Sequence, residues 1–137
     1  MNLKPLTEVI EVHVEAPVYP SEDFYKVAKA IENIIQDVSV SLEGSNPAYL
    51  RGVSRKAESL TKIYNQLRSR ATLSAARRLL FTNASEGSTW IFFNKQAALS
   101  GVVAVCQEES ESPLGPVRVT ISADNIMEFI DWLAPQV

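Results

Sequence analysis

Two kinds of periodicity alternate along this chain, and their order is the feature that most restricts its fold. Residues 10–14 alternate apolar and polar side chains, which predicts a strand with one buried face. Residues 22–36 repeat apolar side chains at helical spacing, which predicts a helix capped by Ser21. Residues 38–42 alternate again and end at the turn sequence GSNP, so a hairpin that returns through residues 49–53 is expected.

The rest of the chain continues this mixture of periods. The further expected elements are two helices (residues 55–68, and a second one capped by Thr72), strands at residues 89–93, 102–106 and 117–121, a single turn over KQAAL capped by Asn94, and a last helix from Asp124 to Leu133. The acidic EESES segment (108–112) is expected to be a solvated connector, and PLGP a rigid turn.

The predicted order is β-α-β-β-α-α-β-β-β-α. It favours an α+β fold in which helices cover one face of a largely antiparallel sheet. With 137 residues, of which 46% are hydrophobic, the chain can bury a core as one domain, or as two small lobes (about 1–55 and 56–137) that share a core. The N-terminal residues lack the pattern of a signal peptide, no apolar run is long enough for a membrane span, and the single cysteine fits a reducing cytoplasm.

Chemistry-bearing motifs are scarce. There is no glycine-rich phosphate loop, no paired-cysteine motif and no HExxH sequence, so we expect no cofactor, no metal and no catalysis. Glu11, His13 and Glu15 project to one side of a strand and leave open a metal site in a small hydrolase, but a polar strand face is the favoured interpretation. Cys106 is expected to be a buried, inert thiol.

The aromatic run at residues 90–93 also has two interpretations. Trp90, Phe92 and Phe93 could offer stacking platforms for nucleobases. The run lacks the flanking basic and glycine residues of an RNA-recognition strand, so core packing is favoured.

The charge distribution is the strongest functional signal. The chain has a formal net charge of −3 at pH 7, yet its basic residues gather in one block. Residues 1–50 carry a net charge of −5, residues 51–78 carry +7, and residues 79–137 carry −5. A local patch of this kind can attract a polyanion even when the whole protein is acidic.

Helical geometry separates two of the arginines in this block. With 100° per residue and Leu73 as origin, Arg77 falls near 40°, at the border of an apolar stripe formed with Ala76 and Leu80. Arg78 falls near 140° and stands clear of that stripe. Clustered arginines favour RNA phosphates through bidentate hydrogen bonds and counterion release. The alternatives are a solvated helix face and a protein-interaction or homodimerisation module that docks acidic surfaces.

Five segments together resemble a known family. They are VYPSEDFYKVAKAIENI, ARRLL, FFNKQAALSG, ESPLGPVRVTI and IDWLAP. In this order they resemble an archaeal family of predicted RNA-binding proteins, some of them described as predicted exosome subunits. The resemblance implies an α+β fold similar to that of the ribosomal protein that binds 5S RNA, an RNA partner and a dimer.

The resemblance also bears on single residues. It places Arg68, Arg70 and Arg77 in a segment that is basic in the family, Lys95 in the NKQAA motif, and Ser74 where an acidic residue is expected. The combined expectation is a non-catalytic protein that binds structured RNA through a basic helical face. The expected contact residues are Arg51, Arg55, Lys56, Lys62, Arg68, Arg70, Arg77, Arg78 and Lys95.

Overall fold

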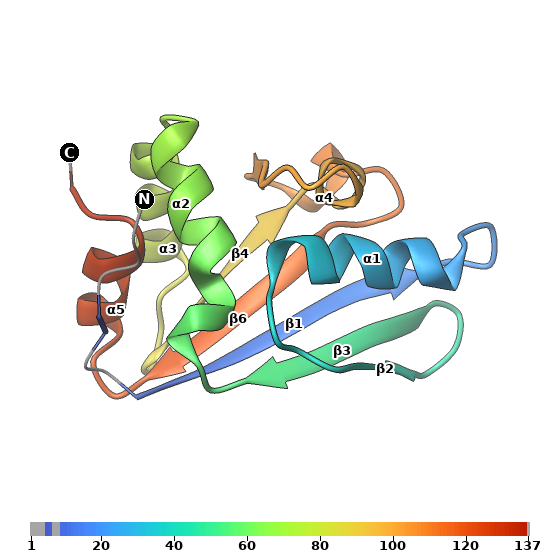
Figure 1. The fold of residues 1–137 in the computed structure, drawn as a ribbon, viewed down its shortest axis with the longest axis horizontal. Helices are drawn as coiled ribbons and strands as arrows, with labels where there is room; N and C mark the ends of the chain where they lie inside the picture. Colours follow the sequence, from blue (N-terminus) through green and yellow to red (C-terminus); the bar gives the residue numbers. More distant parts are fainter. Residues whose placement is uncertain (1–4, 7–8, 137) are drawn as a thin grey trace.

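A computed structural model describes residues 5–6 and 9–136 of the chain (Figure 1). Its strands are β1 (Ile10–Val18), β2 (Val40–Glu43), β3 (Ala48–Ser54), β4 (Ser88–Phe93), β5 (Val105–Cys106) and β6 (Val117–Ala123). Its α-helices are α1 (Phe24–Ile34), α2 (Thr61–Ser69), α3 (Leu73–Thr82), α4 (Lys95–Leu99) and α5 (Ile126–Leu133). Two short 3-10 turns, η1 (Ala57–Leu60) and η2 (Glu109–Glu111), complete the chain. Among the described residues, no helix has the length and apolar character needed to cross a membrane.

The strands form one six-stranded sheet in the order β2-β3-β1-β6-β4-β5. All five neighbouring pairs are antiparallel, as the α+β prediction required. β2 and β3 form the expected hairpin across the GSNP turn. The centre of the sheet is the pair β1 and β6, which come from opposite ends of the described chain.

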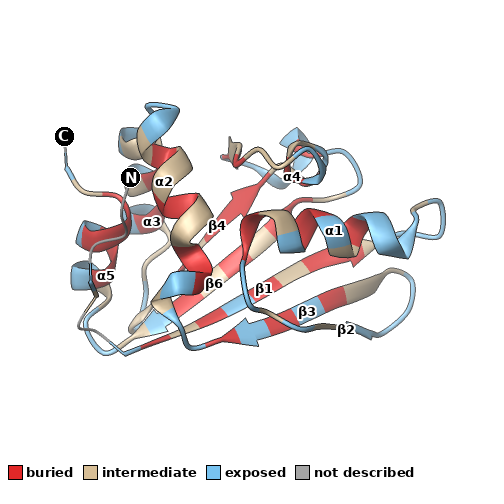
Figure 2. Cartoon of the chain, in the orientation of Figure 1, coloured by how far each residue is buried: buried red, intermediate tan, exposed pale blue. Residues whose placement is uncertain are grey.

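The helices cover one face of this sheet and share one hydrophobic core with it (Figures 1 and 2). Alternation along β1 buries Ile10, Val12 and Val14 against the helices and leaves His13 exposed on the other side. The same alternation in β6 buries Val119 and its apolar neighbours at positions i−2 and i+2. The face of the sheet opposite the helices, which we call the open face, carries the alternate side chains of each strand. These are mostly polar on β1 and β6 and include Trp90 and Phe92 on β4.

Some element boundaries differ from the sequence prediction. Ser21 is not the cap of α1, because Asp23 occupies that position and its carboxylate accepts a hydrogen bond from the backbone N–H of Tyr25 at 2.9 Å. Thr72 lies at the cap position of α3 but makes no side-chain capping bond. Asn94 caps α4 through Ala97, as predicted.

Strand β5 is shorter than the predicted strand at residues 102–106. The backbone N–H of Val102 donates to the carbonyl of Ala97, and that of Val103 donates to Oε1 of Gln66. These donors are therefore used by α4 and α2 before the segment reaches the sheet. The EESES connector also has more structure than expected, because it contains η2, and Ser112 at its end is buried.

Candidate nucleic-acid interface

The structure divides the nine predicted contact residues according to what already binds their charges. Three are held inside the fold, two form ion pairs on the open face, and four have side chains that make no hydrogen bond or ion pair with any described residue. In that order they are Lys95, Arg68 and Arg77; Arg51 and Arg55; and Lys56, Lys62, Arg70 and Arg78.

Lys95 is the most enclosed of the nine, with a side chain that is only 4% exposed. Its Nζ donates to the backbone carbonyls of Pro17 (2.8 Å) and Leu114 (2.7 Å) and to the carboxylate of Glu22 (2.9 Å). Burial lowers the pKa of Lys95, and the hydrogen bond to Glu22 acts in the opposite direction. The ammonium thus joins the start of α4 to the end of β1 and to the turn before β6.

Arg68 and Arg77 both bind the C-terminal end of α5, whose last carbonyls have no partner within the helix. Arg68 donates to the carbonyls of Trp132 (3.1 Å) and Leu133 (3.2 Å), and burial lowers its pKa. Arg77 forms an ion pair with Asp131 at 2.8 Å. Cations are favoured at a helix C-terminus, so these two arginines fasten α5 to α2 and α3.

Arg51 and Arg55 belong to the open face rather than to a helical face. The strand register places Arg51 directly opposite Glu15, and its Nε donates to that carboxylate at 2.8 Å. Glu43 lies 3.8 Å from the same guanidinium, and the hydrogen bond that Arg51 donates to Glu15 raises the pKa of Arg51. Arg55 pairs with Glu11 at 3.0 Å. Both arginines are neutralised by carboxylates of this chain.

Arg70 and Arg78 face a common groove at the corner between α2 and α3. The groove, about 340 Å³ in volume, is bordered by both arginines and by the segment that leads into β5, with Glu111 as its one acidic lining residue among the described residues. The left-handed conformation of Ala71 (φ 56°) turns the chain between the two helices. We call this hollow the Arg70–Arg78 groove.

The wall of this groove is held in place by Gln66 on α2. Its side chain donates to the carbonyl of Gly101 at 2.9 Å and accepts from the backbone N–H of Val103 at 2.7 Å. Lys62, one turn earlier on α2, brings its Nζ within 3.3 Å of where a Cβ on Gly101 would lie. Lys62 therefore flanks the same segment as Arg70 and Arg78. The four arginines near α2 and α3 do not converge, because Arg68 and Arg77 turn towards α5.

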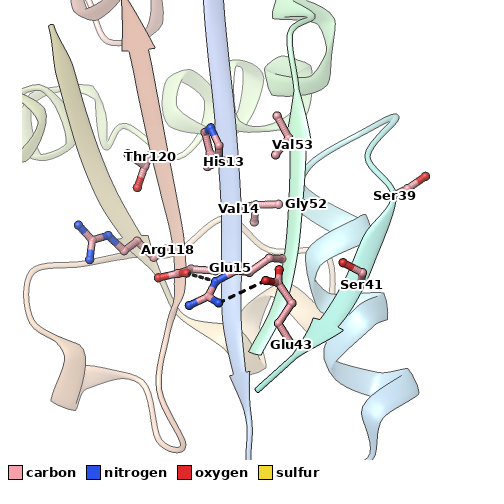
Figure 3. Close-up of a pocket in the computed structure, with 11 residues that line it drawn as sticks. His13, Val14, Glu15, Ser39, Ser41, Glu43, Gly52, Val53, Arg118 and Thr120 are labelled. Carbon is pink, nitrogen blue, oxygen red and sulfur yellow. Dashed lines mark hydrogen bonds and ion pairs between the residues drawn. The ribbon is translucent and has the colours of Figure 1, made fainter. Parts of the chain in front are cut away.

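Sequence reasoning did not select Arg118, which lies on the open face on the same strand as Thr120 (Figure 3). Its guanidinium carbon lies 4.6 Å from the centre of the Trp90 ring, and no described residue forms a hydrogen bond or ion pair with it. The signal was present in the alternation of residues 117–121, which buries the odd positions and places Arg118 on the opposite face.

The other candidates from the sequence show no catalytic arrangement. Among residues 5–6 and 9–136, no three His, Cys, Asp or Glu side chains come together as metal ligands. Glu11 accepts a hydrogen bond from His13, which lowers the pKa of Glu11. Cys106 is buried, and burial raises the pKa of its thiol. Phe93 packs in the core as favoured, whereas Trp90 and Phe92 lie on the other face.

Known proteins resemble this chain over most of its length. A family model described as RNA binding matches residues 11–123. The UPF0201 protein of Methanothermobacter thermautotrophicus is 40% identical over 127 residues, which cover 93% of this chain and 92% of that one. The UPF0201 protein of Aeropyrum pernix is 37% identical over 128 residues and 92% of this chain (85% of its own). A crystal structure of a UPF0201 protein from Methanococcus jannaschii aligns with a TM-score of 0.80, at 36% identity over 93% of this chain and 94% of that one.

Proposed function

The chain belongs to the archaeal UPF0201 family, and from that premise we propose that it is a non-catalytic, cytoplasmic protein that binds structured RNA at the Arg70–Arg78 groove. The observation that carries this proposal is that Arg70 and Arg78 line the same groove and that neither side chain is bound to a carboxylate of the described residues. Lys62 on α2 and Lys56, which directly precedes η1, also make no ion pair with a described residue and would extend the phosphate contacts away from the groove.

The proposal rests on which cations are available rather than on how many there are. An arginine already paired with a carboxylate must give up that partner, or share it, before it can bind a phosphate. Arg70 and Arg78 have no such partner, so each can donate two parallel N–H groups to a phosphate. Contacts to phosphate position the RNA but read little sequence, so recognition would depend on RNA shape.

The rest of the predicted set takes a different role in this proposal. Arg68, Arg77 and Lys95 support the fold, and the proposal assigns them no phosphate. Arg51 and Arg55 would contact RNA only through atoms not used by their carboxylate partners. The expected number of phosphate contacts is therefore smaller than nine.

The test is a salt titration with two matched double variants. Binding of a fluorescent RNA hairpin is followed by anisotropy from low to moderate salt for the wild type, Arg70→Gln with Arg78→Gln, and Lys26→Gln with Lys29→Gln. Lys26 and Lys29 are exposed on α1 and make no ion pair with a described residue, so the control removes the same charge elsewhere. Counterion release predicts that the log–log slope falls by about one unit per lost phosphate contact, or about two for the arginine variant alone.

Three results would overturn the proposal. No binding at low salt would exclude RNA as a partner. Equal losses in the two variants would assign the attraction to overall charge and not to the groove. Self-association of the wild type by light scattering that disappears only in the Arg70→Gln, Arg78→Gln variant would assign the groove to a homodimer, which is the alternative function.

A further inference from the structure

Arg118 differs from the other arginines of the open face because it forms no ion pair with a carboxylate of the described residues. The register of β1 and β6 places it directly opposite Glu15, where an ion pair would be expected. Glu15 instead binds Arg51, and Figure 3 shows the Arg118 side chain pointing away from Glu15. The Arg118 guanidinium carbon lies over the Trp90 ring, 4.6 Å from the ring centre.

The hydrogen-bond donors of Arg118 are correspondingly unfilled. Its Nε is covered by protein atoms and has no hydrogen-bond partner among the described residues. A covered guanidinium N–H without an acceptor is uncommon in folded proteins and calls for an explanation. The cation–π contact with Trp90 provides an attraction for the charge of the guanidinium but no acceptor for its N–H groups.

Arg118 also stands between two hollows of the open face. The larger one, about 610 Å³, extends over β1 and β3 and has polar walls that include His13 and Thr120. The smaller one, about 160 Å³, is bordered by the rings of Tyr19, Tyr49 and Phe92. Arg118 lines both. A ligand that fits this arrangement has a flat apolar ring and, next to it, oxygen or nitrogen acceptors.

We propose that the open face binds an unpaired nucleotide of the RNA, with its base stacked on the layer formed by Arg118 and Trp90. The buried Phe92 ring packs against Trp90 at 4.8 Å, tilted by 54°, and supports the indole from the side. The guanidinium lies between the indole and the base, and its in-plane N–H groups donate to the phosphate beside the stacked base. The inference rests on the proposed RNA function and adds the class of RNA, one with an unpaired segment beside its helix.

Stacking and phosphate binding predict different dependence on salt, which allows the two sites to be tested apart. Base–aromatic stacking contributes about 1–3 kcal/mol per base, which is a factor of about 5 to 140 in affinity, and releases no counterion. The neighbouring charges Glu15 and Glu43 are already held by Arg51, so this face adds little net charge. Loss of the Trp90 ring should therefore weaken binding at every salt concentration without flattening the slope. Arg118→Gln also removes a phosphate contact and should lower the slope by about one unit.

The experiment uses two RNA probes with the same helix, a blunt hairpin and a hairpin with a single-stranded tail that carries 2-aminopurine. The variants are Trp90→Leu, Arg118→Gln and, as a matched control, Arg55→Gln, which removes a 73% exposed cation from the same face. We expect tighter binding of the tailed probe to the wild type, with quenched 2-aminopurine fluorescence. Trp90→Leu and Arg118→Gln should each lose about 5- to 140-fold on the tailed probe only.

The outcomes separate this inference from the proposed function. Equal affinity of the wild type for both probes, or wild-type behaviour of Trp90→Leu and Arg118→Gln on the tailed probe, would overturn the base site while leaving the groove intact. Absence of binding to either probe would overturn both proposals. If Trp90→Leu fails to fold, as judged by circular dichroism, Arg118→Gln decides the result alone. Wild-type self-association that Arg118→Gln abolishes would assign the face to a second copy.

Discussion

Replacement of Lys95 by Met should destabilise the protein strongly, because the ammonium is the donor for three groups inside the fold. The substitution keeps an unbranched apolar stem but removes the ammonium donor of the Pro17 and Leu114 carbonyls and of the Glu22 carboxylate, which keeps the backbone N–H of Tyr19. Removal of one partner from a buried ion pair costs about 3–5 kcal/mol. Glu22 is 13% exposed, so water reaches it in part, and we expect a loss of about 3 kcal/mol in the free energy of unfolding.

Urea unfolding followed by circular dichroism measures this loss. Lys29→Met serves as the matched control, because Lys29 is exposed and makes no ion pair with a described residue, and it should change the free energy by less than about 0.5 kcal/mol. Glu22→Gln combined with Lys95→Met should recover at least about 1 kcal/mol relative to the sum of the single losses, because the two sites are coupled. A loss below about 1 kcal/mol for Lys95→Met would refute the reasoning.

Ionisation of Lys95 should also make the free energy of unfolding rise with pH. Burial lowers the pKa of Lys95 below its usual value of 10.5, so the unfolded chain holds this proton at pH values where the folded chain has begun to lose it. The contribution of this ionisation to the free energy of unfolding is fully present above pH 10.5 and is lost as the pH falls through the folded pKa. Lys95→Met should lack this part of the pH profile.

Two further predictions concern packing and reactivity. Gly52→Ala should lower the free energy of unfolding by about 1–3 kcal/mol, because its Cβ would lie 2.7 Å from Cγ2 of Val38 and 2.9 Å from the carbonyl of Ser39; unchanged stability in urea would show that this segment can move aside. Cys106 should react with a thiol reagent at pH 8 far more slowly in the folded protein than in urea, because burial raises the pKa of its thiol; equal rates would contradict its burial.

The local structure was largely predictable, because it depends on neighbours in sequence. Alternation identified the buried faces of β1 and β6, and helical spacing identified the stripe of α3. Helical spacing also predicted different surroundings for two neighbouring arginines. Arg77 lies against α5, and Arg78 is exposed. These properties follow from the period of each element and not from the tertiary arrangement.

The roles of individual cations were not predictable from the same patterns. Arg68 and Arg70 are two residues apart, yet Arg68 finds acceptors on Trp132 and Leu133, more than sixty positions along the chain. Lys95 finds Glu22 across a similar separation. Such partners are set by strand order and helix packing, which the sequence of one element does not contain. A run of basic residues therefore predicts a charged segment but not which of its members remain available to a ligand.

The central position of β1 and β6 also has a consequence for how the protein is made. β1 is synthesised first among the described strands and β6 last, and they are neighbours at the middle of the sheet. Until residues 117–123 have left the ribosome, β1 can pair only with the β2–β3 hairpin, and its other edge has no partner. Closure over so long a stretch of chain slows folding, and unpaired strand edges favour association between nascent chains. The same pairing that encloses the finished core therefore delays its assembly until β6 has been synthesised.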